Sequence, residues 1–352
     1  MSREESEEQV LVVDDESVAS SSTSMRNSLL DYREENGRTY HRYKDGSTHT
    51  IHLNRHYCEG CVDPKSAEYN LPNDERENDR LDMQHQMWLH ALDDRLGVAP
   101  PCAEGTTVGR VLDVGTGTGI WALNFGDEHP EATVIGNDLS AIQPGFVPPN
   151  VHFEIDDVEE EWTHTEPFEY IHSRIMTSSI SDWPLYLRRS YDNLEPGGHL
   201  ELQEIDLLPR SDDSTLTPSS ALMRWADLLV SASVKFNRPY IQIPTLVDLL
   251  KQVGFVDVGM KVFKWPSNEW PRDAKWKWLG AWQSENMLSG LEGFSMAPLT
   301  RAHGWTRAQV EVFLIDVRRD LKDRNIHAYW HSYCIVGRKP REGENPTVTA
   351  AA

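Results

Sequence analysis

The alternation of apolar runs and amphipathic segments divides the central part of the chain into strands and helices. Short runs rich in Val, Ile and Leu end at acidic or glycine-rich turns, which is typical of buried parallel strands. We expect strands at about 109–114, 132–137, 151–155, 168–172 and 199–205, with helices at about 118–128 and 181–194. Strands that alternate with helices predict an α/β fold with a doubly wound, mostly parallel sheet.

The pattern continues on both sides of this core. Upstream, Asp74 with Glu77 three residues later predicts the start of an amphipathic helix that closes at Gly97. Downstream, Gly254 ends a helix that starts at Thr245. The remaining expected elements are helices at about 222–230 and 306–322 and strands at about 255–263 and 328–336.

Composition shifts predict the domain boundaries. Residues 1–35 are acidic and serine-rich, which is typical of a disordered tail. We expect an N-terminal extension at 36–108 with an insertion at 47–68, a main domain at 109–340 and a frayed tail at 341–352. Within the main domain, residues of about 264–325 are expected to form a helical insert or lid beside the substrate.

The formal net charge of −22 disfavours a nucleic-acid partner, because the chain would repel a phosphate backbone. No apolar run is long enough for a transmembrane helix, and the charged N-terminus does not resemble a secretory signal. We therefore expect a cytoplasmic or nuclear protein. Cys58 and Cys61 have partial zinc-ligand spacing, but a second ligand pair is missing, so no metal is expected.

A glycine-rich turn follows the first core strand, in the segment Val111–Trp121. Its glycines are Gly115, Gly117 and Gly119, preceded by Asp113. The dinucleotide fingerprint requires its third glycine at position 120, which is Ile here, and this disfavours an NAD-dependent oxidoreductase. The pattern of an acidic residue followed by alternating glycines resembles motif I of class I S-adenosylmethionine-dependent methyltransferases. In that family the loop passes under the amino-acid end of the cofactor.

Acidic residues at the ends of successive strands suit the other parts of S-adenosylmethionine. Asp138, at the end of the second core strand, can accept two hydrogen bonds from a ribose diol, although its spacing would also suit NAD. Asp156 and Asp157 can accept from the adenine amino group, with Val158 supplying backbone. Asp113 can order the loop or meet the ammonium end. The predicted cofactor-binding set is Asp113, Gly115, Thr116, Gly117, Gly119, Asp138, Leu139, Asp156, Asp157, Val158, His172 and Ser173.

Several segments resemble the LaeA-like fungal methyltransferases. They are Val111–Trp121, Tyr40/Tyr43-Lys-Asp-Gly, Leu71-Pro-Asn-Asp-Glu75, Arg80-Leu-Asp82, Ile135–Ser140, Phe153–Val158, Ile171-His-Ser-Arg174 and Pro196-Gly-Gly-His199. The resemblance implies a seven-stranded, Rossmann-like class I methyltransferase with S-adenosylmethionine as cofactor and a role in fungal secondary metabolism. Two roles stay open: methylation of a small molecule, and nuclear regulation of metabolite gene clusters through velvet-type protein partners.

Methyl transfer to a hydroxyl acceptor would gain from a general base. His172 at the end of the fourth strand is the first candidate, and Glu204 at the end of the fifth strand is the second. Five tryptophans also crowd the stretch between the last two strands: Trp265, Trp270, Trp276, Trp278 and Trp282. They fit either a packed core or the wall of a pocket for a flat, apolar acceptor.

Overall fold

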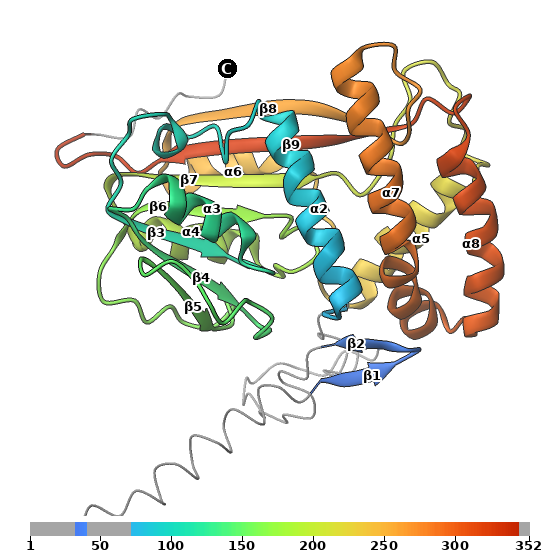
Figure 1. Cartoon of the computed structure of the whole chain (residues 1–352), viewed down its shortest axis with the longest axis horizontal. Helices are drawn as coiled ribbons and strands as arrows, with labels where there is room; N and C mark the ends of the chain where they lie inside the picture. Colours follow the sequence, from blue (N-terminus) through green and yellow to red (C-terminus); the bar gives the residue numbers. More distant parts are fainter. Residues whose placement is uncertain (1–31, 41–71, 345–352) are drawn as a thin grey trace, which may run out of the picture.

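A seven-stranded sheet lies at the centre of the computed structural model, which describes residues 32–40 and 72–344. Its strands are β3 (Arg110–Val114), β4 (Thr133–Asp138), β5 (Val151–Ile155), β6 (Phe168–Arg174), β7 (Leu194–Ile205), β8 (Val256–Pro266) and β9 (Tyr329–Arg338). Their order is β5-β4-β3-β6-β7-β9-β8, and within the sheet only β9 runs antiparallel to its neighbours (Figure 1). The predicted doubly wound, mostly parallel sheet is confirmed.

The direction of winding reverses at the centre of this sheet. From β3 the chain moves outward to β4 and β5, and then it returns to β6 on the other side of β3. Connections therefore leave β3 and β6 in opposite directions. Ligands of open α/β sheets bind at such a switch point, outside the carboxyl ends of the strands.

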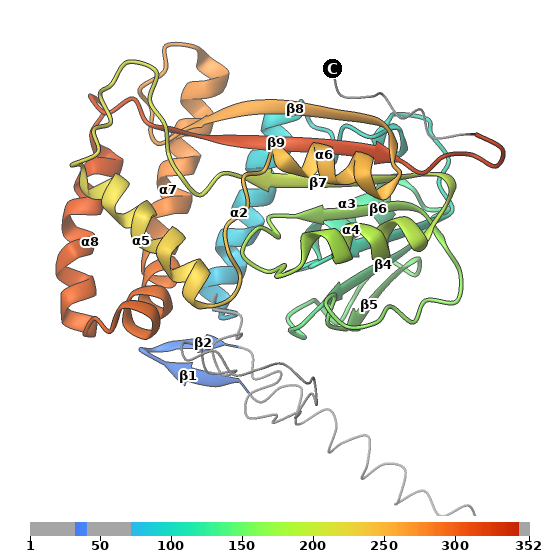
Figure 2. The ribbon, with the colours of Figure 1, turned by 180° about the vertical axis from the view of Figure 1, so that it is seen from behind.

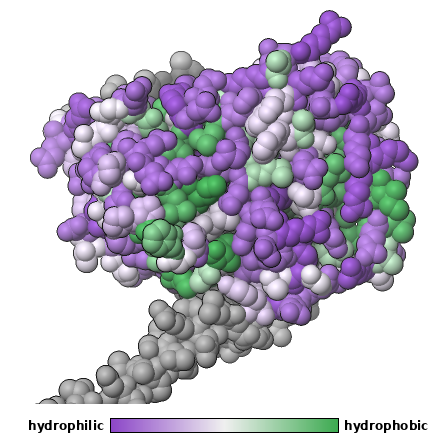
Figure 3. All heavy atoms as spheres, in the orientation of Figure 1, coloured by the Kyte–Doolittle hydropathy of each residue, from purple (hydrophilic) through white to green (hydrophobic). Residues whose placement is uncertain are grey.

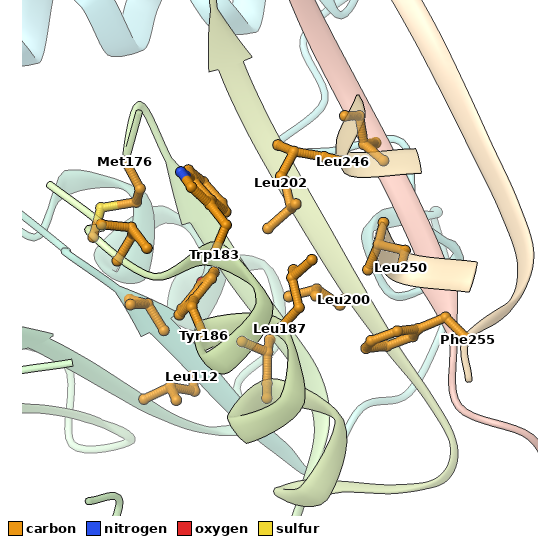
Figure 4. Close-up of a cluster of buried hydrophobic side chains, with 14 of the residues drawn as sticks. Leu112, Met176, Trp183, Tyr186, Leu187, Leu200, Leu202, Leu246, Leu250 and Phe255 are labelled. Atoms are coloured by element: carbon orange, nitrogen blue, oxygen red, sulfur yellow. The ribbon is translucent and has the colours of Figure 1, made fainter. Parts of the chain in front are cut away.

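Helices cover both faces of the sheet. α3 (Ile120–Glu128) packs on one face, whereas α4 (Trp183–Asp192) and α6 (Thr245–Val253) pack on the other (Figures 1 and 2). Leucines of the strands interlock with α4 and α6 in a buried apolar cluster (Figure 4). Its members include Leu112, Leu200, Leu202, Trp183, Tyr186, Leu187, Leu246, Leu250 and Phe255.

A second layer of helices lies beyond the carboxyl end of the sheet. It contains α5 (Ala221–Lys235), α7 (Ala274–Ala297) and α8 (Arg307–Lys322), and it has an apolar core of its own. α8 starts as predicted, because the Thr306 side chain and Gln309 form a reciprocal capping box. The outer face of the molecule is largely hydrophilic, and an apolar area lies at the right edge over α8 (Figure 3).

α2 (Glu75–Ala91) lies between the sheet and the outer helices (Figure 1). The Asp74 side chain caps it by accepting from the Glu77 backbone, as predicted. Its predicted end at Gly97 is wrong. Asp93 and Asp94 both adopt positive φ angles of 55° and 61°, which takes the backbone out of the helix after Ala91.

Buried polar side chains join α2 to α7. Arg80 donates to Oε1 of Glu77 from Nε and Nη2, at 3.0 and 2.7 Å, and its Nη1 donates to Oδ1 of Asn286 at 2.7 Å. These groups are buried, so each charge needs the partner that the structure provides. The ion pair within α2 therefore orients Arg80, and the hydrogen bond from Arg80 to Asn286 fixes α2 against α7.

A small hairpin precedes α2 and consists of β1 (Arg33–Glu35) and β2 (Arg38–Tyr40). Its turn uses Asn36 and Gly37 with φ of 54° and 81°, as two-residue hairpin loops favour. β1 lies within residues 1–35, which were expected to be a disordered tail. Residues 1–31 of that tail, the insertion at 47–68 and Tyr43 lie outside the described residues.

Two further boundaries differ from the predictions. β7 starts at Leu194 rather than at 199, because Pro196-Gly-Gly198 is accommodated in the strand by an irregular register with β6. The expected insert at 264–325 begins with the end of β8 and then contains all of α7 and α8. Within residues 32–40 and 72–344, no helix is long and apolar enough to cross a membrane. The same residues contain no cluster of three or more potential metal ligands.

Candidate functional site

The glycine loop joins β3 to α3 at the switch point. Gly115, Gly117 and Gly119 have φ angles of 67°, 57° and 83°, in the left-handed region that favours glycine. A Cβ at Gly115 would lie 2.6 Å from Sδ of Met176, and one at Gly119 would lie 2.4 Å from Cζ of Phe153. At Gly117 the nearest atom would be a methyl of Leu81 at 3.6 Å. Backbone is therefore exposed for close approach at Gly117, while the other two glycines are packed.

Asp138 lies against this loop from the end of β4. Its Oδ2 accepts from the Gly117 backbone at 2.9 Å, and its Oδ1 accepts from the Ser140 backbone at 3.0 Å. Burial raises the pKa of Asp138 to about 6, although backbone hydrogen bonds, including one from Leu139, counteract the shift. The structure thus brings two predicted site elements into direct contact: the middle glycine and the carboxylate at the end of the second core strand.

The end of β5 joins the same edge. The Asp156 backbone donates to the Asp138 carbonyl at 3.1 Å, which places the next predicted acidic pair beside Asp138. Asp156 and Asp157 use carboxylate oxygens to accept backbone hydrogen bonds from Asp157 and Glu159, both at 2.9 Å. Asp157 is buried and shapes the turn, whereas Asp156 and Val158 are half-buried. These residues therefore lie beside Asp138 at the carboxyl edge of the sheet.

Both carboxylate oxygens of Asp113 accept hydrogen bonds from other side chains of the protein. Oδ1 accepts from Nδ1 of His172 at 2.7 Å, and Oδ2 accepts from the Thr116 hydroxyl at 2.6 Å. His172 also stacks on the Trp121 ring of α3, with ring centroids 3.8 Å apart. Of the two roles expected for Asp113, ordering the loop is the one that these contacts support, because Thr116 belongs to the loop itself.

The N-terminal segment covers the loop from outside the sheet. Asp82 of α2 accepts from the Thr118 hydroxyl at 2.7 Å, and Leu81 faces Gly117. Asn73 donates to Ser140 at 3.4 Å, and Tyr32 donates to the Ala141 carbonyl at 3.5 Å. The predicted site set missed these residues. Asn73 lies in the segment Leu71–Glu75, and Leu81 and Asp82 lie in Arg80–Asp82. Both segments resemble the LaeA-like family, but the resemblance does not assign a role to these residues.

Comparison with known proteins agrees with this geometry. A family described as a methyltransferase domain matches residues 83–259. The methyltransferase pytC of Aspergillus terreus is 39% identical over 322 residues, covering 91% of this chain and 92% of pytC. The chain belongs to the LaeA-like methyltransferases. A secondary metabolism regulator of Cochliobolus heterostrophus is 37% identical (88% and 95% covered), and the protein-methionine methyltransferase laeA of Emericella nidulans is 33% identical (88% and 77% covered). These matches to methyltransferases argue against an NAD-dependent oxidoreductase.

The two residues expected to act as bases in this methyltransferase are both fully buried. Glu204 accepts from the backbones of Met176 and Thr177 at 2.9 and 3.2 Å, and from the Thr177 hydroxyl at 2.5 Å. Burial raises its pKa to about 7. His172 is covered by Trp121. A base must reach the proton that it removes, so the contacts of these residues are those of groups that hold the strand ends in place.

The turn after β6 carries strain next to these contacts. Ile175 has a φ of 54°, which is unfavourable for a β-branched residue. Its backbone donates to the Gln203 carbonyl of β7 at 2.7 Å, and Glu204 holds the following two residues. Ser173, another predicted cofactor contact, is completely buried just before this turn. Backbone strain of this kind clusters at functional sites because surrounding contacts must maintain it.

The tryptophans between positions 265 and 282 make packing contacts. Trp265 is fully buried against Trp88 of α2, and Trp278 stacks between His90 and Trp282. His90 lies eight residues beyond Asp82 along α2, which corresponds to about 12 Å of helix. The sequence left two interpretations of this aromatic stretch, a packed core and the wall of an acceptor pocket. These contacts favour a packed core between α2 and α7.

The loop geometry predicts unequal costs for alanine substitutions. Gly119→Ala combines an unfavourable φ with a clash against Phe153, so we expect it to lower the free energy of unfolding by about 2–4 kcal/mol. Gly117→Ala meets no clash and should cost about 1–2 kcal/mol. Urea denaturation followed by circular dichroism measures both. Equal losses would contradict the assignment of Gly117 as the open position.

Proposed function

We propose that this methyltransferase uses S-adenosylmethionine and methylates a small molecule of fungal secondary metabolism. The observation that carries the proposal is the contact between the open Gly117 backbone and the Asp138 carboxylate at the switch point of the sheet. A cofactor with a ribose diol and a narrow amino-acid chain fits this pair. The name of the relative pytC supports a methyltransferase reaction, and the relatives named as secondary metabolism regulators support the metabolic role.

Each part of the cofactor has groups suited to it. The ribose hydroxyls would donate to Asp138, whose ionised form accepts two strong, charge-assisted hydrogen bonds. Adenine would lie beside Leu139 and Val158, with its amino group toward Asp156 or Asp157. The amino-acid chain would pass over Gly117, where the nearest atom to an added Cβ would be a methyl of Leu81 at 3.6 Å. The hydroxyl and amino groups of this cofactor would account for the acidic residues at the strand ends.

When bound, the cofactor supplies an electrophilic methyl group for in-line displacement, so the protein mainly has to align two reactants. Asp113 and His172 would set the position of the glycine loop, because they link it to β6. Glu204 would hold the turn at Met176 and Thr177. We therefore assign His172 and Glu204 to positioning instead of proton transfer. The buried Nε2 of His172 has no hydrogen-bond partner among residues 32–40 and 72–344, so a contact with the cofactor would require Trp121 to move.

The cofactor assignment predicts a selective thermal shift. S-adenosylhomocysteine should raise the melting temperature of the full chain, because a ligand that binds only the folded state stabilises it. NADH at the same concentration should leave the melting temperature unchanged. Differential scanning fluorimetry measures both. Stabilisation by NADH alone would refute the proposed cofactor.

Gly117→Arg serves as the matched variant for this experiment. Arginine would occupy the open space above the loop, at a φ that costs about 1–2 kcal/mol and leaves the fold intact. The thermal shift should then disappear. Gly105→Arg has a similarly positive φ of 76° with open space around it, and should retain the shift.

Affinity for the cofactor should depend on pH through Asp138. A carboxyl group with a pKa of about 6 is ionised above this pH and protonated below it. Only the ionised form accepts from both ribose hydroxyls, so affinity for S-adenosylhomocysteine should fall as pH drops from 7 to 5, by up to about tenfold per unit below the pKa. Isothermal titration calorimetry at several pH values measures the profile, and Asp138→Asn should flatten it. A profile that Asp138→Asn leaves unchanged would assign the titration to another group.

A second function has support from the relatives named as secondary metabolism regulators and as a protein-methionine methyltransferase. On this alternative the methyl acceptor is a protein, and velvet-type partners take the place of a small molecule. We expect label from methyl-tritiated S-adenosylmethionine to appear in small molecules when the chain is incubated with a fungal extract that contains both metabolites and proteins. Label confined to protein bands would favour the regulator.

A further inference from the structure

Arg174 is a half-buried cation at the carboxyl end of β6. Its Nε donates to Oε1 of Gln203 at 2.8 Å, and its Nη1 donates to Nδ1 of His85 at 3.0 Å. The guanidinium carbon lies 5.5 Å from the centre of the Trp88 ring. Its Nη2 is buried and has no hydrogen-bond partner among the described residues.

The hydrogen-bonded partners of Arg174 carry no negative charge, and the carboxylates of Asp113 and Glu201 favour its charged form only through space. Arg38 and Arg80, the buried arginines nearby, both pair with Glu77, and Arg38 also pairs with Asp74. His85 is neutral, because burial followed by the charge of Arg174 lowers its pKa to about 3. Burial also lowers the pKa of Arg174 to about 10, so it remains charged at neutral pH. A half-buried cation with one buried nitrogen unsatisfied calls for an anionic ligand.

The position of Arg174 indicates which anionic group would bind there. Ser173 pairs with Val114 across the sheet, so Arg174 and Gly115 are the next residues on adjacent strands. On the other side, α2 contributes His85 to Arg174 and, one turn earlier, Leu81 to Gly117. The unsatisfied guanidinium therefore lies between the glycine loop and α2, along the path proposed for the amino-acid end of the cofactor.

We infer that Arg174 binds the carboxylate of that amino-acid end. The inference rests on the proposed use of S-adenosylmethionine. Gln203 and His85 hold two of the guanidinium nitrogens in place before the ligand binds, and Nη2 is left to donate to the ligand. The contact would be charge-assisted, and the strained turn at Ile175 would keep the Arg174 backbone in place.

The test compares two ligands on three proteins by isothermal titration calorimetry. S-adenosylhomocysteine carries the carboxylate, whereas its decarboxylated analogue keeps the amine and the adenosine. Wild type should bind the complete ligand about 10- to 100-fold more tightly than the analogue. Arg174→Gln should remove this preference by weakening only the complete ligand. The matched control is Arg110→Gln, at the opposite end of β3, where Arg110 pairs with Glu166. It should bind both ligands as wild type does.

Each other outcome has a definite meaning. Equal weakening of both ligands by Arg174→Gln would overturn the inference in favour of a structural role. Unchanged binding of both ligands, with slower methyl transfer, would overturn it in favour of a contact with the acceptor. Wild type that binds neither ligand would instead refute the proposed function. If circular dichroism shows Arg174→Gln to be unfolded, Arg174→Lys keeps the charge, and it should reduce but retain the preference for the carboxylate.

Discussion

The left-handed backbone of the glycine loop is the constraint on which the rest of the site depends. Three alternate residues between β3 and α3 have positive φ angles, and only glycine adopts them without strain. The loop therefore turns tightly enough for Met176 and Phe153 to close over Gly115 and Gly119. Gly117 is left open between them, and Asp138 reaches its backbone N–H. The shape of the loop thus follows from backbone conformation before any side chain contributes.

Buried carboxylates maintain this geometry from within the fold. Asp113 ties the loop to β6 through His172, and Glu204 holds the turn that follows β6. Their hydrogen bonds compensate for the cost of removing charge from water. Because methyl transfer needs alignment more than proton transfer, groups that hold strand ends in place fit the chemistry of this site better than a buried base would.

The N-terminal segment completes the site from the side opposite the sheet. α2 places Asp82 on Thr118 and His85 on Arg174, while the segment before it reaches Ser140. The same helix is joined to α7 by the hydrogen bond from Arg80 to Asn286. The cofactor edge and the outer helices are therefore mechanically connected through α2. A displacement of α7 would therefore shift α2 and, through Asp82, the glycine loop.

The sequence by itself determined the order of strands and helices, the glycine turn and the strand-end positions of Asp138 and Asp156. Local spacing encodes these features, because apolar periodicity, helix caps and glycine positions act over a few residues. It misplaced the end of α2 and the start of β7, which depend on left-handed residues and on strand register. Only the tertiary structure decided that His172 and Glu204 are buried and that Asp82 and Arg174 adjoin the loop. Such contacts join residues far apart in the chain, and no local pattern encodes them.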